Sequence, residues 1–129
     1  MTNQIQPQSV DFDLLLRSNL ERVFNQRNKV ERDRAISELF TEHPVMYEPG
    51  QPVEGRDAIS DVAGNLLEQF GPIFAFTPQG NGVGHHGMGT LRWTAGDLNG
   101  AVVVQGYDTA EVVDGRISRL WVLIDPGKS

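Results

Sequence analysis

The stretch QGYDTAEVVDGRISRLW, residues 105–121, decides the fold. It opens inside a run of strand-forming residues, AVVVQGYDTAEVV (101–113), turns at Asp114-Gly115 and continues as ISRLWVLID (117–125). An Asp-Gly pair between two alternating apolar runs is typical of a tight β-hairpin. The C-terminal part of the chain is therefore predicted to form antiparallel strands.

One carboxylate in this hairpin, Asp108, falls on the apolar side of its strand. Alternation places it on the same face as four apolar residues: Val102, Val104, Ala110 and Val112. An ionised carboxylate is costly in apolar surroundings, so the pKa of Asp108 should rise. A carboxyl group that keeps its proton near neutral pH can work as a general acid. The alternative is that Asp108 pairs with an inward-facing arginine or belongs to a polar network.

The N-terminal half carries helical periodicity in three segments: Asp11 to about Asn28, Glu31 to Phe40, and about Arg56 to Phe70. Either Asp11 or Ser9 is expected to cap the first helix. Gly71-Pro72 is expected to stop the third.

Extended segments alternate with turns elsewhere in the chain. Two short pieces surround a Pro-Gly turn in residues 43–55, and further strands are predicted at 73–79, 86–95, 101–113 and 117–125. Helices followed by a run of strands indicate an α+β fold, in which a bent antiparallel sheet and its covering helices enclose a cleft. We expect one domain over residues 11–125, a flexible N-terminal tail at 1–10 and a short C-terminal tail at 126–129.

Composition excludes several classes of function. The 129-residue chain has no cysteine, which removes disulfide scaffolds and thiolate zinc sites. A net charge of −6 argues against nucleic-acid binding. No stretch is apolar enough to span a bilayer, and the first residues do not resemble a signal peptide. We expect a cytoplasmic protein that binds neither nucleic acid nor membrane.

Three stretches carry a resemblance to a known family: AISELF (35–40), YEPGQPVEGRDAI (47–59) and GYDTAEVVDGRISRLWVLID (106–125). In their order and spacing they resemble the nuclear-transport-factor-2-like (NTF2-like) superfamily, in the branch of SnoaL-like polyketide cyclases and ketosteroid isomerases. The resemblance implies a cone-like curved antiparallel sheet wrapped by three N-terminal helices, a cystatin-like α+β barrel. It also implies a pocket for a small apolar ligand and a homodimer through the outer sheet face.

The resemblance also implies roles for two carboxylates. Asp108 takes the place of the acid that relatives use in proton transfer. Glu48, before the Pro-Gly turn, takes the place of the isomerase general base, an aspartate, with an arm one methylene longer. The alternative for Glu48 is an exposed turn residue. A helix tyrosine of the isomerases is replaced by Leu20, so ketosteroid isomerisation itself is not expected.

Two adjacent histidines follow a glycine-rich run. Alternation assigns His85 to the face of Trp93, while His86 goes with Arg92. An inward histidine could share protons with Asp108, so His85 is a catalytic candidate and His86 a binding candidate. The alternative is that both are surface loop residues. Neighbouring histidines on a strand diverge, so no metal site is predicted.

Further substrate-binding candidates are aromatic or basic. They are Arg92, Trp93, Tyr47, Trp121 and Phe24. Trp93 could form an apolar ligand wall, and Arg92 could pair with a carboxylate. Trp121 could stack on a flat ligand, although a role in the core or in a dimer contact is the alternative.

These residues favour a cofactor-free enzyme that performs general acid/base chemistry on a small, largely apolar cyclic or polyketide-like substrate. Isomerisation, cyclisation and dehydration are the candidate reactions, with Asp108, Glu48 and His85 as catalytic residues. One alternative is a non-catalytic small-molecule-binding or dimerisation domain. A second is an epoxide hydrolase of the limonene type, which would need an inward Asp–Arg–Asp set.

Overall fold

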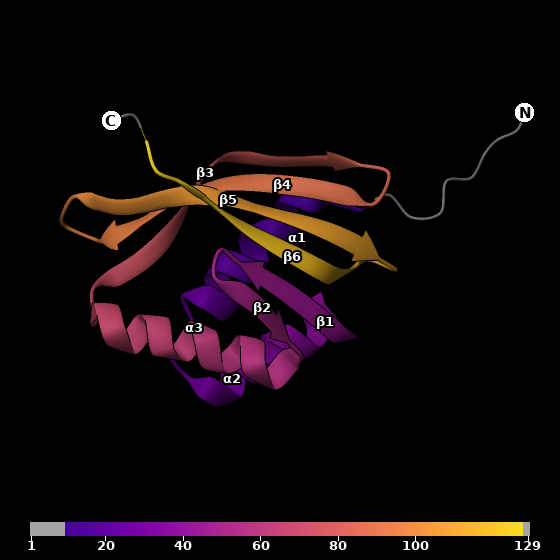
Figure 1. The fold of residues 1–129 in the computed structure, drawn as a ribbon, viewed down its shortest axis with the longest axis horizontal. Coiled ribbons are helices and arrows are strands. Elements are labelled where there is room, and N and C mark those ends of the chain that lie inside the picture. Colours follow the sequence, from indigo (N-terminus) through magenta and orange to yellow (C-terminus); the bar gives the residue numbers. More distant parts are fainter. Residues whose placement is uncertain (1–9, 128–129) are drawn as a thin grey trace, which may run out of the picture.

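The computed structural model describes residues 10–127. Helices come first along the chain and the long strands later, as the sequence pattern predicts (Figure 1). The helical segments are α1 (Phe12–Asn19), a π-helical turn η1 (Leu20–Phe24), α2 (Lys29–Leu39) and α3 (Arg56–Phe70). The strands are β1 (Phe40–Glu48), β2 (Gln51–Glu54), β3 (Phe74–His85), β4 (Met88–Asp97), β5 (Val102–Val113) and β6 (Arg116–Asp125).

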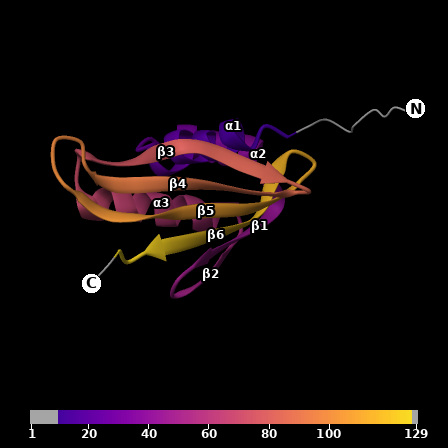
Figure 2. The ribbon, with the colours of Figure 1, turned by 90° about the horizontal axis from the view of Figure 1, so that it is seen from above.

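The six strands form one open, curved sheet in the order β2-β1-β6-β5-β4-β3. Strands β3 to β6 are antiparallel neighbours, as predicted. Strand β1 differs, because it runs parallel to β6. A long connection separates these two strands in sequence, so no tight turn forces them to be antiparallel. The helices lie together on one side of the sheet (Figures 1 and 2), which confirms the predicted α+β cone.

The first helix ends earlier than the prediction of about Asn28. Asp11 caps it, since its side chain accepts a hydrogen bond from the backbone N–H of Leu14 at 2.9 Å. After η1 the helix stops at Asn25, whose side chain bonds both the N–H and the C=O of Phe76 at 2.8 Å. The Asn25 side chain thus attaches the end of this helical segment to β3.

Other boundaries also differ from the predicted ones. Helix α2 starts at Lys29 rather than Glu31, because the Asn28 side chain accepts the N–H of Glu31 at 3.0 Å and caps it. It ends at Leu39, and Phe40 already belongs to β1. Strand β3 reaches His85, beyond the predicted residues 73–79, because a bulge after Gln79 lets pairing with β4 resume.

The core lies between the helices and the inner face of the sheet. Its largest fully buried side chains come from every layer: Leu16, Leu20, Ile36, Phe40, Met46, Ile59, Leu91, Ile117 and Leu120. Each such side chain contributes roughly 1.5–3 kcal/mol relative to leaving it in water. This packing fixes the helices against the strands and therefore fixes the walls of any cavity left between them.

Helix α1 is fastened to the edge strand β3. The carboxylate of Asp13 accepts the N–H of Gly82 at 2.7 Å, and Arg17 donates to the carbonyl of Gly80 at 2.9 Å. Phe12 lies directly on the backbone of β4 at Gly89, where an added Cβ would overlap its ring. These contacts occupy an exposed strand edge and hold α1 and η1 over the sheet.

Candidate active site

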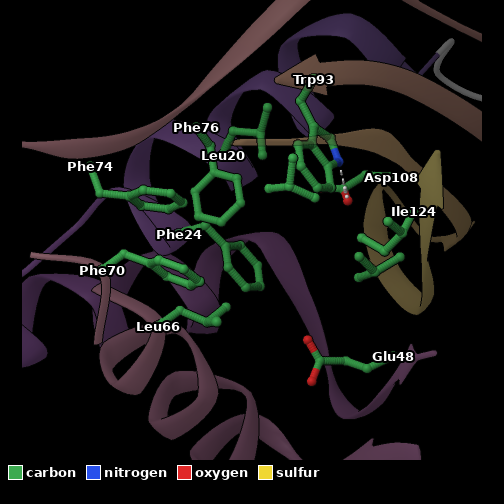
Figure 3. A pocket seen from close by; sticks show the side chains of 12 residues that line it. Leu20, Phe24, Glu48, Leu66, Phe70, Phe74, Phe76, Trp93, Asp108 and Ile124 are labelled. Atoms are coloured by element: carbon green, nitrogen blue, oxygen red, sulfur yellow. Dashed lines mark hydrogen bonds between the residues drawn. The ribbon is translucent and has the colours of Figure 1, made fainter. Parts of the chain in front are cut away.

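An apolar cavity of about 220 Å³ lies between the helices and the inner face of the sheet (Figure 3). Its mouth carries Phe70, from the end of α3, and Ile124, from the end of β6, since both are exposed to solvent. The lining residues are Leu20, Phe24, Glu48, Leu66, Phe70, Phe74, Phe76, Trp93, Val104, Asp108, Val122 and Ile124. The wall is thus almost entirely hydrocarbon, with two acids set into it.

Asp108 is buried in this wall, with only 3% of its surface exposed. Its Oδ1 accepts a hydrogen bond from Trp93 Nε1 at 2.9 Å, and its Oδ2 accepts one from Asn19 Nδ2 at 3.4 Å. Among the residues that the structure describes, no ion pair involves Asp108. The sequence-based alternative of pairing with an inward arginine therefore fails.

The pKa of Asp108 is raised to about 7. Loss of hydration on burial raises it, while the hydrogen bonds from Trp93 and Asn19 lower it in part. Both donors are neutral, so neither supplies the positive charge that would keep the carboxylate ionised. Near neutral pH the group can therefore hold a proton or release it.

A glycine lets Trp93 reach Asp108. Trp93 on β4 is paired in register with Gly106 on β5, and Leu91 with Asp108. A Cβ at Gly106 would lie 2.9 Å from Cζ2 of the Trp93 indole and would collide with the carbonyl of Leu123. The indole ring of Trp93 therefore lies across β5 above Gly106, and its Nε1 reaches Asp108, two residues further along β5.

Asn19 was not predicted from the sequence. It is fully buried at the last position of α1, next to η1, and its Oδ1 has no hydrogen-bond partner within residues 10–127. A π-turn interrupts the regular helical ladder and is often found at functional sites. The available signal was its spacing, since Asn19 follows Leu15 and Leu16 by four and three residues and so shares their buried stripe.

Glu48 is the second acid of the cavity. It ends β1, before the Pro49-Gly50 turn, and is half-buried. Desolvation raises its pKa above the ordinary value. Figure 3 shows Glu48 and Asp108 on different walls, both facing the same space. The two carboxyl groups differ in exposure, and such a difference in environment can give two acids of one site different pKa values.

Aromatic rings form one continuous side of the cavity. Phe76 makes edge contacts with Trp93 and with Phe74, at centroid distances of 5.3 and 5.5 Å, and Phe70 stacks on Phe74 at 4.5 Å. Phe24 meets the edge of Phe76 at 6.0 Å. Two of the predicted binding residues, Phe24 and Trp93, therefore lie in the lining.

The structure does not bring the two histidines to this cavity. His85 ends β3 and His86 occupies the following turn with a φ of 50°, and both are exposed. Their Nδ1 atoms lie 2.8 Å apart. The in–out alternation of a strand cannot be extended through these positions, because a turn begins directly after His85. The assignment of His85 as proton partner of Asp108 is therefore corrected.

Three other candidates lie on the outer face of the sheet. Arg92 is exposed and donates to the Gln105 side chain at 3.1 Å. Tyr47 stacks on Trp121 with ring centroids 5.3 Å apart, and neither lines the cavity. Each sits one position from an inward residue, such as Trp93 or Glu48, so alternation directs it outward.

Over residues 10–127, no three histidine, aspartate or glutamate side chains are grouped as a metal site requires. In the same span, the helices are too short or too polar to cross a membrane.

Comparison with known proteins identifies the family. The SnoaL-like domain family matches residues 20–120, so this chain belongs to that family. No curated protein matches the chain.

Solved structures share the fold at low sequence identity. A candidate isomerase of the SnoaL-like family from Agrobacterium tumefaciens has a TM-score of 0.81 at 20% identity, covering 89% of this chain and 97% of that one. A candidate ketosteroid isomerase from Kribbella flavida has 0.69 at 16% identity, covering 92% and 81%. A candidate polyketide cyclase from Sinorhizobium meliloti has 0.64 at 17%, covering 84% and 92%. The fold is that of NTF2-like proteins.

Proposed function

We propose that this protein is a cofactor-free enzyme that uses Asp108 as general acid and Glu48 as general base on a small, largely apolar cyclic substrate. Isomerisation, cyclisation and dehydration all fall within this chemistry. The observation that carries the proposal is a buried carboxyl group without a cationic partner, which shares an apolar cavity with a second, half-buried carboxyl group. Relatives described as isomerases and polyketide cyclases support it.

Both carboxyl groups take part in each proton transfer. Protonated Asp108 donates a hydrogen bond to a substrate carbonyl oxygen, which acquires negative charge when a neighbouring C–H bond breaks. Ionised Glu48 takes up that proton and returns it to a different carbon, so the enzyme ends as it began. Trp93 Nε1 donates to the other oxygen of Asp108 and holds the carboxyl group in place.

Exchange of α-hydrogens tests the proposal without knowledge of the natural substrate. A cyclic ketone such as 2-decalone in D₂O should lose its α-proton NMR signals faster with the enzyme than in buffer. Asp108→Asn should slow this enzymatic exchange by about 10²-fold or more, in line with general acid–base contributions. The matched control is Asp97→Asn, since Asp97 is an exposed acid of β4 outside the cavity. An Asp108→Asn rate equal to that of the parent would refute the proposal.

The second candidate function is non-catalytic binding or carriage of a small molecule. Leu20 favours it, because it lines the cavity where the isomerases resembled by this sequence carry a phenol. Binding of ketones without any enzymatic α-hydrogen exchange would select this function. An epoxide hydrolase of the limonene type is not supported, since none of the cavity's lining residues within the described chain is an arginine.

A homodimer through the outer sheet face remains a proposal. Exposed apolar side chains on that face support it, among them Tyr107 and Leu123, which pair across β5 and β6. Light scattering should give twice the mass of the 14.3 kDa chain. Leu123→Arg should shift the protein towards monomer, and a parent protein that is monomeric at about 100 µM would contradict the proposal.

A further inference from the structure

The ionisable residues of the cavity wall are all acidic. Of its twelve lining residues, two are acids and none is lysine, arginine or histidine. Arg27, in the loop between η1 and α2, donates its guanidinium hydrogens to the carbonyls of Leu67, Gly71 and Phe74. Among residues 10–127, no positive charge therefore lines the cavity to receive an anionic group.

An anionic ligand would meet repulsion as well as desolvation. Glu48 is half-buried, so its carboxylate is screened less than a surface charge. A carboxylate or phosphate brought into the same apolar space would lose its hydration and gain no hydrogen-bonding cation. An uncharged carbonyl escapes both penalties and can accept a hydrogen bond from protonated Asp108.

The size of the cavity limits the number of rings. A cavity of about 150 Å³ holds a single benzene ring, and the cavity here has about 220 Å³. Its far end is closed by Trp93 and Leu20, which are buried, while its mouth lies at Phe70 and Ile124. One ring, or two fused rings, would fit between these limits. A four-ring ketone would project through the mouth into solvent.

We infer that the cavity selects an uncharged ketone of one or two rings, and that Glu48 acts as a specificity residue which rejects carboxylates and phosphates. This inference rests on the proposed function for the role of Asp108 as hydrogen-bond donor. It narrows the substrate class of the same site from largely apolar cyclic compounds to neutral, compact ones.

Binding measured without turnover tests the inference. The chain has two tryptophans, so Trp121→Phe leaves Trp93 as the single emitter in the cavity wall. The fluorescence of Trp93 would be recorded at pH 7.5 during titration with three ligands. They are 2-decalone, the matched anion decahydro-2-naphthoate and the four-ring ketone 5α-androstan-3-one. None of these saturated compounds absorbs strongly where tryptophan does, since the ketone n→π* band is weak. Isothermal titration calorimetry would give independent dissociation constants.

The inference predicts an order of affinities for these ligands. The two-ring ketone should bind at least about 10-fold more tightly than its carboxylate counterpart, which is a modest effect for two like charges in one apolar site. Glu48→Gln should reduce that ratio several-fold by strengthening carboxylate binding. Glu54→Gln, at an exposed position of β2, should leave it unchanged. The four-ring ketone should bind more weakly than the two-ring ketone.

Three results would overturn the inference: equal binding of the ketone and the carboxylate, tighter binding of the four-ring ketone, or no binding of any ketone. Failure of the proposed function would give a different combination of results. In that case the ketone preference would hold, while enzymatic α-hydrogen exchange would be absent or indifferent to Asp108→Asn.

Discussion

Two aspartates, Asp33 in the helical layer and Asp108 in the sheet, are placed in opposite electrostatic surroundings. Asp33 accepts hydrogen bonds from Lys29 at 2.6 Å and from Ser60 at 2.5 Å. Burial alone would raise its pKa, but these bonds and the nearby charges of Lys29 and Arg32 lower it below the ordinary value. Asp108 has neutral donors only, and its pKa rises to about 7.

The difference separates an acid that is held ionised from one that can titrate near neutral pH. A carboxylate with a cationic partner stays ionised at every physiological pH and ties α2 to α3 through Ser60. A carboxyl group with neutral donors, deeper burial and an adjoining cavity can change its protonation state at neutral pH. Charge in the helical layer therefore stabilises the fold, whereas the proposed function assigns a chemical role to the acid of the sheet.

The largest expected effect is on the pH dependence of stability. The folded pKa of Asp108 lies near 7, above the ordinary value of 3.8. Between these two pKa values the folded state binds more protons than the unfolded state. The contribution of Asp108 to the free energy of unfolding therefore falls as the pH rises from about 4 to 7. Asp108→Asn removes this dependence. Relative to the parent, it should gain about 2 to 4 kcal/mol between pH 4 and pH 8.

Chemical denaturation at several pH values provides the measurement. Asp33→Asn is the matched comparison, because a lowered folded pKa gives the opposite sign: its contribution is present above pH 4 and lost as the pH falls. Parallel pH profiles for the parent and Asp108→Asn would contradict the assignment of a raised pKa.

A cation placed beside Asp108 should make it resemble Asp33. Val122 lies directly opposite Asp108 on β6 and lines the cavity. The ammonium of Val122→Lys would favour the ionised form and lower the pKa of Asp108 by at least 1 to 2 units. Enzymatic α-hydrogen exchange at pH 7 should then fall by about 5- to 50-fold, since a smaller fraction of Asp108 keeps its proton.

Val122→Met is the uncharged control for that substitution, because it also lengthens the side chain. It should retain most of the exchange rate. If Val122→Met is as inactive as Val122→Lys, the loss reflects packing, and charge is not the deciding factor.

Removal of the stronger donor should shift the pH profile in the other direction. The hydrogen bond from Trp93 favours the ionised form of Asp108, so Trp93→Phe should raise the pKa further. The basic limb of the rate profile should move up by about one pH unit, a 10-fold change in proton affinity. Trp121→Phe removes an indole from the outer face of the sheet and should not shift the pH profile of the rate. Coincident shifts in both variants would contradict a specific role for Trp93.

The smallest effect is expected at Asn19. Its hydrogen bond to Asp108 is longer, at 3.4 Å, so Asn19→Leu should shift the rate profile upward by less than Trp93→Phe does. The substitution also removes a buried Oδ1 without a partner, so the free energy of unfolding should stay level or rise by about 1 kcal/mol. A large loss of stability would show that Asn19 is primarily a packing residue.

The sequence predicted the parts of the site that follow from strand alternation. Asp108 was placed inward on a regular strand, where a period of two holds. Arg92 and Trp93 were assigned to opposite faces, and the sequence did not decide which of the two lines the pocket. The approach of Trp93 to Asp108 could not be predicted, because it depends on the cross-strand register that sets Trp93 opposite Gly106. Glu48 was found through the resemblance, since its position before a turn carries no periodic signal.

The errors have identifiable physical causes. His85 was misplaced because alternation was counted through a turn, and Asn19 was missed because its polar side chain lay in a stripe read as apolar. The early end of the first helix depends on Asn25 bonding the backbone of Phe76, a contact fifty-one residues away in sequence. Such long-range hydrogen bonds override local helical periodicity.

Titration of the Asp108 carboxyl group tests the central claim most directly. Selective ¹³C labelling of aspartate side chains, with Asp108→Asn to assign the signal, would follow its chemical shift from pH 3 to pH 9. The account predicts a midpoint near pH 7. A midpoint at or below about 4, the value of an ordinary aspartate, would contradict it.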